Sequence, residues 1–404
     1  MRACGLIVEY NPFHNGHQYH IEQARTQSQA DCIIAVMSGN FLQRGEPAII
    51  DKYNRAKAAL TSGVDILLEL PFAYAVQSSH YFAKGAIHTL NEIGVSSLCF
   101  GSEQGTIADF ITAYHIQSKH AGNYHATIKK YLAKGLSYPT ASAKAIQSFA
   151  PNDLQIDLTK PNNILGFSYV NRVLKDNLPI DLLTIKRIDS DYHDDTIKGT
   201  IASATSIRKQ LLSNASFSEE VNRSLPNPSI NALKNYRHTA TLWHDWENYF
   251  PLLKYRVLTM AANELASIHH VDEGLEHRII QSVKQATSFN HWMQLIKTKR
   301  YTWTRLQRMF VHILTNTKKT HIKQIHEQAT VPYIRLLGFT TNGRKYLNHV
   351  KKQLNIPLIS QVSQLDHLCL KLDEKASDAY YTVLPIKQQL THQQKELQGP
   401  LIFS

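Results

Sequence analysis

Residues 4–20, CGLIVEYNPFHNGHQYH, decide the fold that we expect for this chain. The segment opens with a short, continuous apolar run, which is typical of a strand buried on both faces of a parallel sheet. Pro12 then disfavours a helical conformation at Asn11, so the strand should end in a turn. The sequence therefore predicts a buried strand, a sharp turn and then a helix.

Two histidines follow this turn and bracket Asn15 and Gly16. His14 and His17 are three residues apart, so on a helix that starts near Asn15 they share one face at its N-terminal end. Unpaired N–H groups at that end favour an anion, and Gly16 lets an anion approach the backbone closely. We therefore expect a phosphate site at which two imidazoles donate hydrogen bonds.

The same histidines have two alternative roles. His14, His17 and His20 could bind a metal ion, or they could simply be polar residues at a helix start. A metal site would need further ligands, and no nearby cysteine or carboxylate pattern supplies them. We predict no metal-ligating residue in this chain.

HNGH resembles the HxGH motif of the nucleotidyltransferase superfamily, whose members bind ATP at the end of the first strand and attack its α-phosphate. A wider set of segments, VEYNPFHNGHQYH, SGNFLQRGEP, DKYNRAKAAL, FGSE and PNNILG, resembles the bacterial tRNA(Met) cytidine acetate ligase family. The resemblance is strong over roughly the first half of the chain and looser over the second. It implies an enzyme that adenylates acetate with ATP and passes the acetyl group to N4 of the wobble cytidine of elongator methionine tRNA.

The resemblance also implies where ATP binds: at the end of the first strand, at the HNGH helix start and at four later sites. The implied ATP contacts are Ile7, Val8, Glu9, Tyr10, Asn11, Pro12, Phe13, His14, Asn15, Gly16, His17, His20, Gly101, Asn162, Arg187, Ile188, Ser203 and Ser206. From the residues alone, Gly101 is more simply a turn glycine, and the amide of Asn162 could equally cap a helix.

SATSIRK at 203–209 resembles the S/T-x-x-I-R element that closes on the triphosphate in HxGH enzymes. Its hydroxyls and helix-start amides would meet phosphate oxygens. A third element is the polar loop NFLQRGEP, in which Arg44 is suited to clamp a carboxylate or phosphate, or else to pair with Glu46 or Asp51. The expected catalytic residues are His14, His17, Arg44, Ser206 and Arg208.

Five apolar runs alternate with helical patterns through the first half of the chain. They lie at 4–8, 31–37, 64–70, 95–101 and 182–188. Such alternation predicts an α/β fold with a Rossmann-like, doubly wound parallel sheet. We expect a catalytic domain at 1–212 with a helical insertion at about 105–150, a Ser/Asn/Pro-rich linker at 213–240, and a mainly helical basic domain at 241–404.

The 404 residues are 43% hydrophobic and can bury a large core. Cys4, Cys32, Cys99 and Cys369 are widely spaced in apolar surroundings, which predicts reduced core thiols. The N-terminus lacks a basic stretch followed by a long apolar segment, and no window of eighteen apolar residues occurs. These features favour a cytoplasmic protein without a membrane partner.

The net charge of +12 is placed unevenly. Residues 1–210 hold 20 Lys and Arg against 18 Asp and Glu, whereas the remaining 194 hold 24 against 14. Between Lys297 and Leu365 there are 13 basic residues and one acidic residue. This stretch, interleaved with aromatic residues, predicts the tRNA contact, although an unoccupied basic surface would have the same composition. The candidate RNA-binding residues are Arg300, Arg305, Arg308, Lys318, Lys319 and Lys323.

The expected cofactors are ATP and Mg²⁺, although Asp189, Asp191, Asp194 and Asp195 are more simply explained as solvated loop residues than as magnesium ligands. Two rival functions remain from residues alone. A small-molecule adenylyltransferase would share HNGH and SATSIR but would not need a basic second half. A non-catalytic RNA-binding protein would need the basic half but not two phosphate-binding elements.

Overall fold

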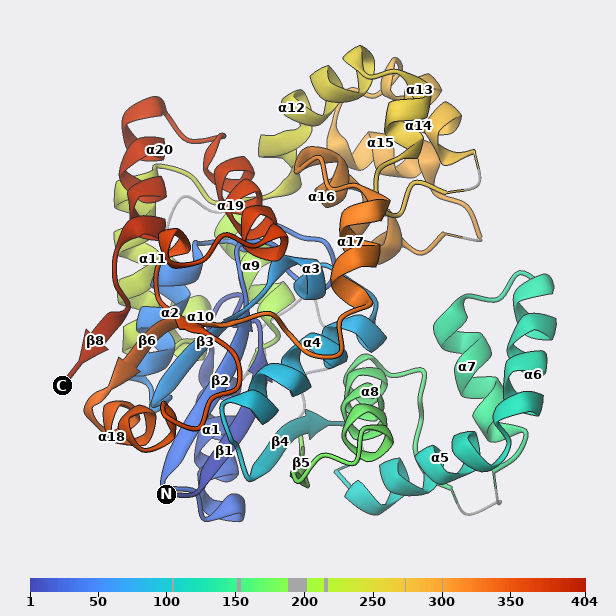
Figure 1. Cartoon of the computed structure of the whole chain (residues 1–404). Coiled ribbons are helices and arrows are strands. Elements are labelled where there is room, and N and C mark those ends of the chain that lie inside the picture. Colours follow the sequence, from blue (N-terminus) through green and yellow to red (C-terminus); the bar gives the residue numbers. More distant parts are fainter. Residues whose placement is uncertain (104, 151–153, 188–201, 214–216, 273, 300) are drawn as a thin grey trace.

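A single sheet forms the framework of the protein (Figure 1). The computed structural model describes residues 1–103, 105–150, 154–187, 202–213, 217–272, 274–299 and 301–404. Within this part of the chain the strands are β1 (Ala3–Val8), β2 (Cys32–Ser38), β3 (Ile66–Leu70), β4 (Ser97–Ser102), β5 (Asp181–Lys186), β6 (Ile334–Thr340), β7 (Leu358–Ile359) and β8 (Leu401–Phe403). Their order is β5-β4-β1-β2-β3-β6-β7, and β8 pairs with β6.

The first five strands are mutually parallel, and β1 lies between β4 and β2. Every residue of β2 and β3 is buried, as expected for strands covered on both faces. The register pairs Ala3 with Cys32 and continues to Val8 opposite Met37. The Rossmann-like α/β fold predicted from the apolar runs is confirmed.

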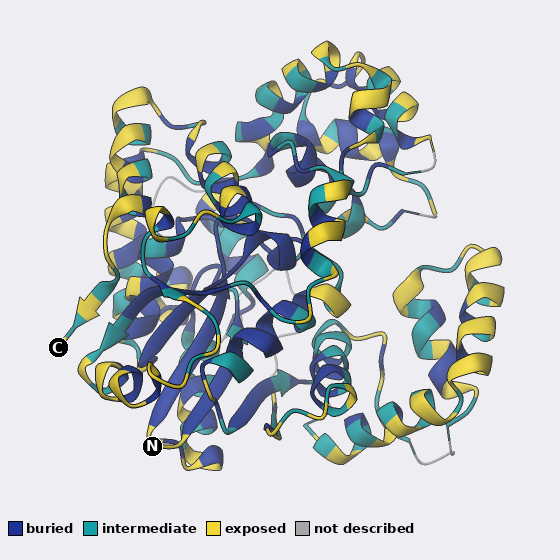
Figure 2. Cartoon of the chain, viewed as in Figure 1, coloured by how far each residue is buried: buried dark blue, intermediate teal, exposed yellow. Residues whose placement is uncertain are grey.

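Helices connect these strands and pack along the sheet. They are α1 (Asn15–Ser28), α2 (Lys52–Thr61), α3 (Phe72–Ala75), α4 (Ser79–Glu92) and α8 (Pro161–Lys175). Asp51 caps α2 by accepting a hydrogen bond from the backbone N–H of Asn54 at 2.8 Å. Between β4 and α8 the chain forms a lobe of three helices, α5 (Ile107–Lys119), α6 (Ala121–Ala133) and α7 (Tyr138–Gln147). Figure 2 shows that this lobe is largely exposed, whereas strands β1 to β4 are largely buried.

The segment predicted as a linker contains helices instead. After α9 (Ala204–Ser213) come α10 (Glu219–Ser224) and α11 (Asn227–Ala240), and α11 packs against α2. Ser218 accepts a hydrogen bond from the N–H of Val221 at 3.2 Å, and a proline lies in the first turn of α11. The Ser and Pro residues that suggested a linker are therefore helix-start residues.

The second half of the chain is mainly helical but does not stand apart from the sheet. It first forms α12 (Trp246–Thr259), α13 (Ala262–Ala266), α14 (Leu275–Val283), α15 (Phe289–Ile296), α16 (Trp303–Leu314) and α17 (Lys319–His326). It then returns to the sheet through β6, which runs antiparallel to β3. Around β7 and β8 lie α18 (Thr341–Val350), α19 (Leu368–Tyr381), α20 (Ile386–Gln393) and the short 3-10 helices η1 (Val362–Gln364) and η2 (Gln394–Leu397). A boundary near residue 241 is thus wrong for the part of the chain that enters the sheet.

The four cysteines are free thiols in buried positions, as predicted. No helix in the described ranges combines the length and the hydropathy needed to cross a bilayer.

Candidate active site

A cavity of about 720 Å³ opens at the carboxyl ends of β1, β4 and β5. Since β2 and β4 flank β1 on opposite sides, this is the point at which the strand order reverses, where open α/β sheets bind ligands. Residues at the N-terminal ends of α1, α8 and α9 also line the cavity. Three helix starts around one cavity of this volume suit a small ligand that carries negative charge.

Arg55 of α2 holds the chain where β1 leaves the sheet. Its buried guanidinium donates to the carbonyls of Glu9 at 2.6 Å and Ser38 at 3.1 Å, and also to that of Gly39. Beyond Glu9 the backbone turns through Tyr10, which has a φ of 50°, and a cis peptide bond joins Asn11 to the following proline. Arg55 therefore ties together the ends of β1 and β2, beside the cavity.

His14 caps α1, and its ring stacks on that of His17 with centroids 3.7 Å apart. The backbone N–H of His14 donates to Nδ1 of His17 at 3.2 Å, which assigns the proton of a neutral His17 ring to Nε2. Burial, aided by the nearby charge of Arg187, lowers the pKa of His14 to about 3 and that of His17 well below its usual value. Both imidazoles are therefore neutral at pH 7, so each ring carries an N–H group and no positive charge.

Four polar atoms of cavity-lining residues are buried and lack a hydrogen-bond partner within the described chain. They are Tyr10 Oη, Asn11 Nδ2, His14 Nδ1 and His20 Nε2. A buried polar group without a partner costs about 1–3 kcal/mol, so such groups gathered around a cavity indicate a polar ligand.

The SATSIRK segment begins α9 at the opposite wall of the cavity. Ser203 Oγ accepts a hydrogen bond from the N–H of Ser206 at 3.1 Å, which caps the helix. Ser206 is fully buried and donates its hydroxyl to the carbonyl of Ser203 at 2.8 Å, so it does not line the cavity as predicted. Thr205 lines it instead. Arg208 donates to the carbonyl of Asn11 at 2.8 Å, which links the two motifs.

Charged groups of both signs surround the cavity. The basic residues in its lining are Arg44, Lys160, Lys186, Arg187 and Arg208. Glu46 forms an ion pair with Arg208 at 3.2 Å, and Asp51 lies outside the cavity and meets Lys395 at 3.0 Å. Glu46 and Asp51, the two partners that we considered for Arg44, therefore each form an ion pair with another basic residue.

Glu103 is a site residue that the sequence analysis did not single out. Its carboxylate accepts hydrogen bonds from the N–H groups of Asn162 and Asn163 at 3.1 and 2.8 Å, and from the Asn162 amide at 2.9 Å. It therefore caps α8 and orients Asn162, which lines the cavity. The sequence feature that could have predicted this role is an acidic residue directly after β4, because an acidic side chain is stabilised at a helix N-terminus.

Most of the implied ATP contacts lie around the cavity. Those that line it are Ile7, Val8, Glu9, Tyr10, Asn11, His14, Gly16, His17, His20, Gly101, Asn162, Arg187 and Ser203, together with Arg44 and Arg208. Pro12, Phe13, Asn15 and Ser206 do not line it. Phe13 is buried against the ring of Tyr10, and Asn15 donates to the carbonyl of Arg223 at 2.8 Å. Ile188 and the four aspartates at 189–195 lie outside the described residues.

Helices from the second half of the chain support the loop that carries Arg44. Trp246 Nε1 donates to the carbonyl of Gly45 at 3.0 Å, and Arg308 donates to the carbonyls of Gln43 and Gln77 at 3.4 and 3.2 Å. Gly45 has a φ of 78°, and an added Cβ would lie 2.2 Å from the backbone nitrogen of Arg308. Arg308 thus packs against the loop, and its predicted contact with RNA stays a prediction.

The other candidate RNA-binding residues lie on or near the surface. Arg305 and Lys319 both contact Asp272, at 3.5 and 2.9 Å, and Lys318 donates to Ser267 at 3.1 Å. The side chain of Lys323 is 78% exposed. Arg300 lies outside the described residues.

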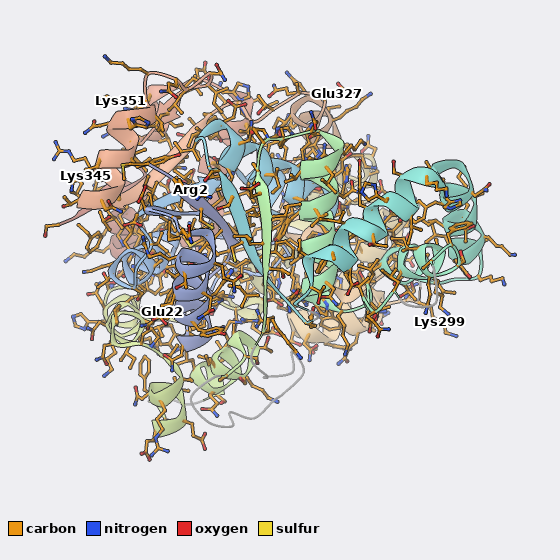
Figure 3. All side chains as sticks on the ribbon, turned by 90° about the horizontal axis from the view of Figure 1, so that it is seen from below. Arg2, Glu22, Lys299, Glu327, Lys345 and Lys351 are labelled. Carbon is orange, nitrogen blue, oxygen red and sulfur yellow. The ribbon has the colours of Figure 1, made fainter. Side chains whose placement is uncertain are left out.

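The basic stretch between Lys297 and Leu365 does not form one patch. Figure 3 shows Lys299 at the far end of the molecule from Lys345 and Lys351. Arg335 of the same stretch is 1% exposed, inside the sheet region.

Known proteins resemble this chain over its whole length. A model of the HIGH Nucleotidyl Transferase family matches residues 1–396. The tRNA(Met) cytidine acetate ligase of Oceanobacillus iheyensis is 51% identical over 403 residues, which cover 100% of both chains. The chain belongs to the tRNA(Met) cytidine acetate ligase family. The family member from Bacillus subtilis is 48% identical and covers 96% of this chain and 94% of its own.

Solved structures of the family share the fold. TmcAL from Thermotoga maritima in its apo form I superposes with a TM-score of 0.91 at 32% identity, with 100% of both chains covered. The same protein bound with alpha-thio ATP gives a TM-score of 0.90 at 32% identity over the same coverage. An ATP analogue therefore binds a homologue of this fold.

Proposed function

We propose that this chain is an ATP-dependent tRNA(Met) cytidine acetate ligase that works through an acetyl-adenylate. The observation that supports this most directly is the cavity, where two phosphate-binding motifs meet at the switch point of the sheet. Its unpartnered donors fit the oxygen-rich triphosphate of ATP, and its basic residues offset the charge of that group.

In the first step an acetate oxygen attacks the α-phosphorus of ATP and pyrophosphate leaves. His17 Nε2 and the ring N–H of His14 would donate to phosphate oxygens, while the amides at the starts of α1 and α9 face the same charge. Because the two imidazoles are neutral, the positive charge comes from the cavity arginines, chiefly Arg187 and Arg208. Catalysis by such fixed groups relies on positioning and preorganised electrostatics.

The Glu46–Arg208 pair gives Arg208 a positioning role as well. The ion pair joins α9 to the loop that carries Arg44. The hydrogen bond from Arg208 to the carbonyl of Asn11 joins α9 to the segment that follows β1. ATP that meets Arg208 would therefore also order this loop. We place the acetate carboxylate near Arg44, where a guanidinium can meet it with two hydrogen bonds.

In the second step the N4 amino group of the wobble cytidine attacks the acetyl carbonyl and AMP leaves. The adenylate must be shielded from water between the two steps. The tRNA contact is proposed on the surface that carries Arg305, Lys318, Lys319 and Lys323, whose charges would meet phosphates. We propose that the protein acts in the cytoplasm, since its proposed substrate is tRNA.

The carboxylates that line the cavity fit poorly as magnesium ligands. Glu9 accepts from the N–H of Gln43, Glu46 pairs with Arg208, and Glu103 caps α8. Asp157 Oδ1 accepts hydrogen bonds from Thr159. We infer that Mg²⁺ reaches the site on the phosphates of ATP, with water as its other ligands.

Exchange of labelled pyrophosphate into ATP tests the first step. We expect exchange that requires acetate and does not require tRNA, because adenylation is reversible and pyrophosphate is its product. Acetyl-coenzyme A in place of acetate should support none. A cofactor adenylyltransferase would instead show exchange with a phosphorylated co-substrate, which would contradict the ligase.

Mass spectrometry of nucleosides tests the second step. After incubation with ATP, labelled acetate and total tRNA, we expect the label in N4-acetylcytidine of elongator methionine tRNA. If folded, ATP-binding protein showed no acetate-dependent exchange with or without tRNA, the acetate-ligase function would be refuted.

A further inference from the structure

Three histidines gather away from the cavity, between helices of the second half of the chain. His269 and His270 lie in the connection from α13 to α14, and His312 lies on α16. Each ring offers one nitrogen, and the three nitrogens lie within 4.8 Å of one another. None of the three residues lines the active-site cavity.

The hydrogen bonds of two rings leave a lone pair free for a ligand. His312 Nε2 lies 3.1 Å from the carbonyl of Val76, which can only accept, so the proton is on Nε2 and Nδ1 carries the lone pair. His269 Nε2 lies 3.2 Å from Oε1 of Gln77 and is the donor in the same way. A histidine that binds a metal almost always donates its other N–H to a carbonyl or carboxylate in this manner.

The remaining atoms of the cluster lack partners. His270 Nε2 and His312 Nδ1 are buried with no hydrogen-bond partner among the described residues, and His312 is 0% exposed. The ring of His270 lies 4.2 Å from that of His269 and 5.5 Å from that of His312, between centroids. Buried ring nitrogens without partners are costly, and a shared metal ion would satisfy both.

The charges around the cluster restrict the ions that would bind. Neutral imidazole is the form that ligates metals, and the hydrogen bonds of His269 and His312 leave a ring nitrogen of each available in that form. Arg305, Arg308, Lys319 and His326 oppose a cation here, and Asp272 favours one. A hard ion such as Mg²⁺ or Ca²⁺ needs oxygen ligands, which the three rings do not provide.

We propose that His269, His270 and His312 form a binding site for a divalent transition-metal ion, with Zn²⁺ as the best match. Three imidazoles and one water complete the tetrahedral coordination that Zn²⁺ prefers. Small rotations of the rings would bring the nitrogens to bonding distance. The ion would fasten the α13–α14 connection to α16, one turn from Arg308, which packs against the Arg44 loop.

The first test is the stoichiometry and affinity of metal binding. Full-length protein is stripped with a chelator, dialysed, and titrated with Zn²⁺ by calorimetry and with Co²⁺ by visible absorption. We expect one ion per chain and the strong visible bands of tetrahedral Co²⁺. His270→Gln and His312→Gln should each weaken Zn²⁺ binding by about 10²-fold or more, since each removes a ligand. His321→Gln, on α17 outside the cluster, is the matched control and should bind like the parent.

The second test uses neither of these two substitutions. Saturating Zn²⁺ should raise the Tm of the parent and of His321→Gln, but not that of His269→Gln, whose ring is partly exposed. ATP binding by His269→Gln shows that the variant is folded. Equal Zn²⁺ affinity in the parent and the cluster variants would overturn the proposal. So would the loss of the ion in His17→Ala, which would place it at the active site.

Discussion

Two buried polar clusters lie at the ends of strands in the same sheet, and the first of them lines the active-site cavity. Beside β1, β4 and β5, the buried histidine nitrogens and the Asn11 amide lack partners. Beside β3 and β6, Lys52 and Arg335 face Glu69 and Glu396, so that two cations meet two anions. The first cluster is open to a ligand, whereas the second is closed by the chain itself.

The closed cluster joins segments that are far apart in the sequence. Lys52 Nζ lies 2.9 Å from carboxylate oxygens of both Glu69 and Glu396, and Ser377 donates to Glu396 at 2.7 Å. The four charged side chains are 8% exposed or less. Because the charges balance within the cluster, it stabilises the return of the chain to the sheet. Arg335 Nε and Nη1 lack a hydrogen-bond partner in the described chain, although Nη1 lies 3.1 Å from a carboxylate oxygen of Glu69. The balance of opposite charges, more than the depth of burial, therefore distinguishes this structural cluster from the one that lines the cavity.

Breaking the closed cluster should give the largest effect. Arg335→Ala leaves Glu69 and Glu396 with one cation between them, so we expect the free energy of unfolding to fall by about 3–5 kcal/mol. Urea denaturation followed by circular dichroism measures this. Arg344→Ala, at an exposed position on α18, is the control and should change stability by less than about 0.5 kcal/mol. Similar small losses in both variants would contradict a structural role for the cluster.

The same cluster predicts a loss of stability in acid. Burial alone would raise the pKa of Glu396, but Lys52 and Arg335 outweigh it and hold that pKa at about 2. The pKa of this carboxylate in the unfolded chain is about 4.5. Its lowered pKa in the folded protein therefore stabilises the fold by about 3 kcal/mol at pH values above 4.5, and this stabilisation is lost as the pH falls toward 2. Glu396→Gln should flatten the fall in Tm between pH 4.5 and 2. An unchanged slope would show that Glu396 titrates normally.

At the open cluster, His17→Ala should slow acetate-dependent pyrophosphate exchange by about 10²-fold, because it removes the Nε2 donor that we propose for the triphosphate. The Tm should change little, since the ring lies at a cavity edge. His115→Ala, on α5 of the exposed lobe, is the matched control. Full exchange activity in folded His17→Ala protein would refute its catalytic role.

Glu103→Gln should have a smaller effect, because the amide can still accept hydrogen bonds from the start of α8 but loses the charge. We expect a stability loss of about 1 kcal/mol, and weaker ATP binding through a less ordered Asn162. Calorimetric titration with ATP measures the second effect. Restoration of the parent affinity in Glu103→Asp would support a positioning role, and an unchanged ATP affinity in Glu103→Gln would contradict it.

Charge reversal on the proposed RNA surface should give the smallest change for each residue. Lys323→Glu removes one exposed cation, so tRNA affinity should fall several-fold and its salt dependence should flatten by about one unit of slope. ATP binding should not change. Lys351→Glu, at an exposed position directly after α18, is the control. Equal tRNA affinity in both variants would place the RNA contact elsewhere.

The sequence alone determined the five parallel strands of the sheet and the two motifs that line the cavity. Apolar runs predicted β1 to β5 because a strand buried on both faces needs no polar side. HNGH and SATSIRK predicted helix starts, and because each follows a strand, their meeting at one sheet edge followed from the topology. The sequence was sufficient to predict the structure wherever residues that are adjacent in the chain form one motif.

Only the tertiary structure decided the rest, because it depends on contacts between residues that are far apart in the chain. Arg335 lies in a basic stretch, yet partners at 69 and 396 bury it within the sheet. Glu103 meets the helix start at 162, and Arg308 packs against the loop at 43–45. His312 meets His269 and His270 across more than forty residues. A side chain's charge and hydrogen-bonding groups are set by its identity, but whether they are paired, buried or open to a ligand depends on what the fold brings beside them.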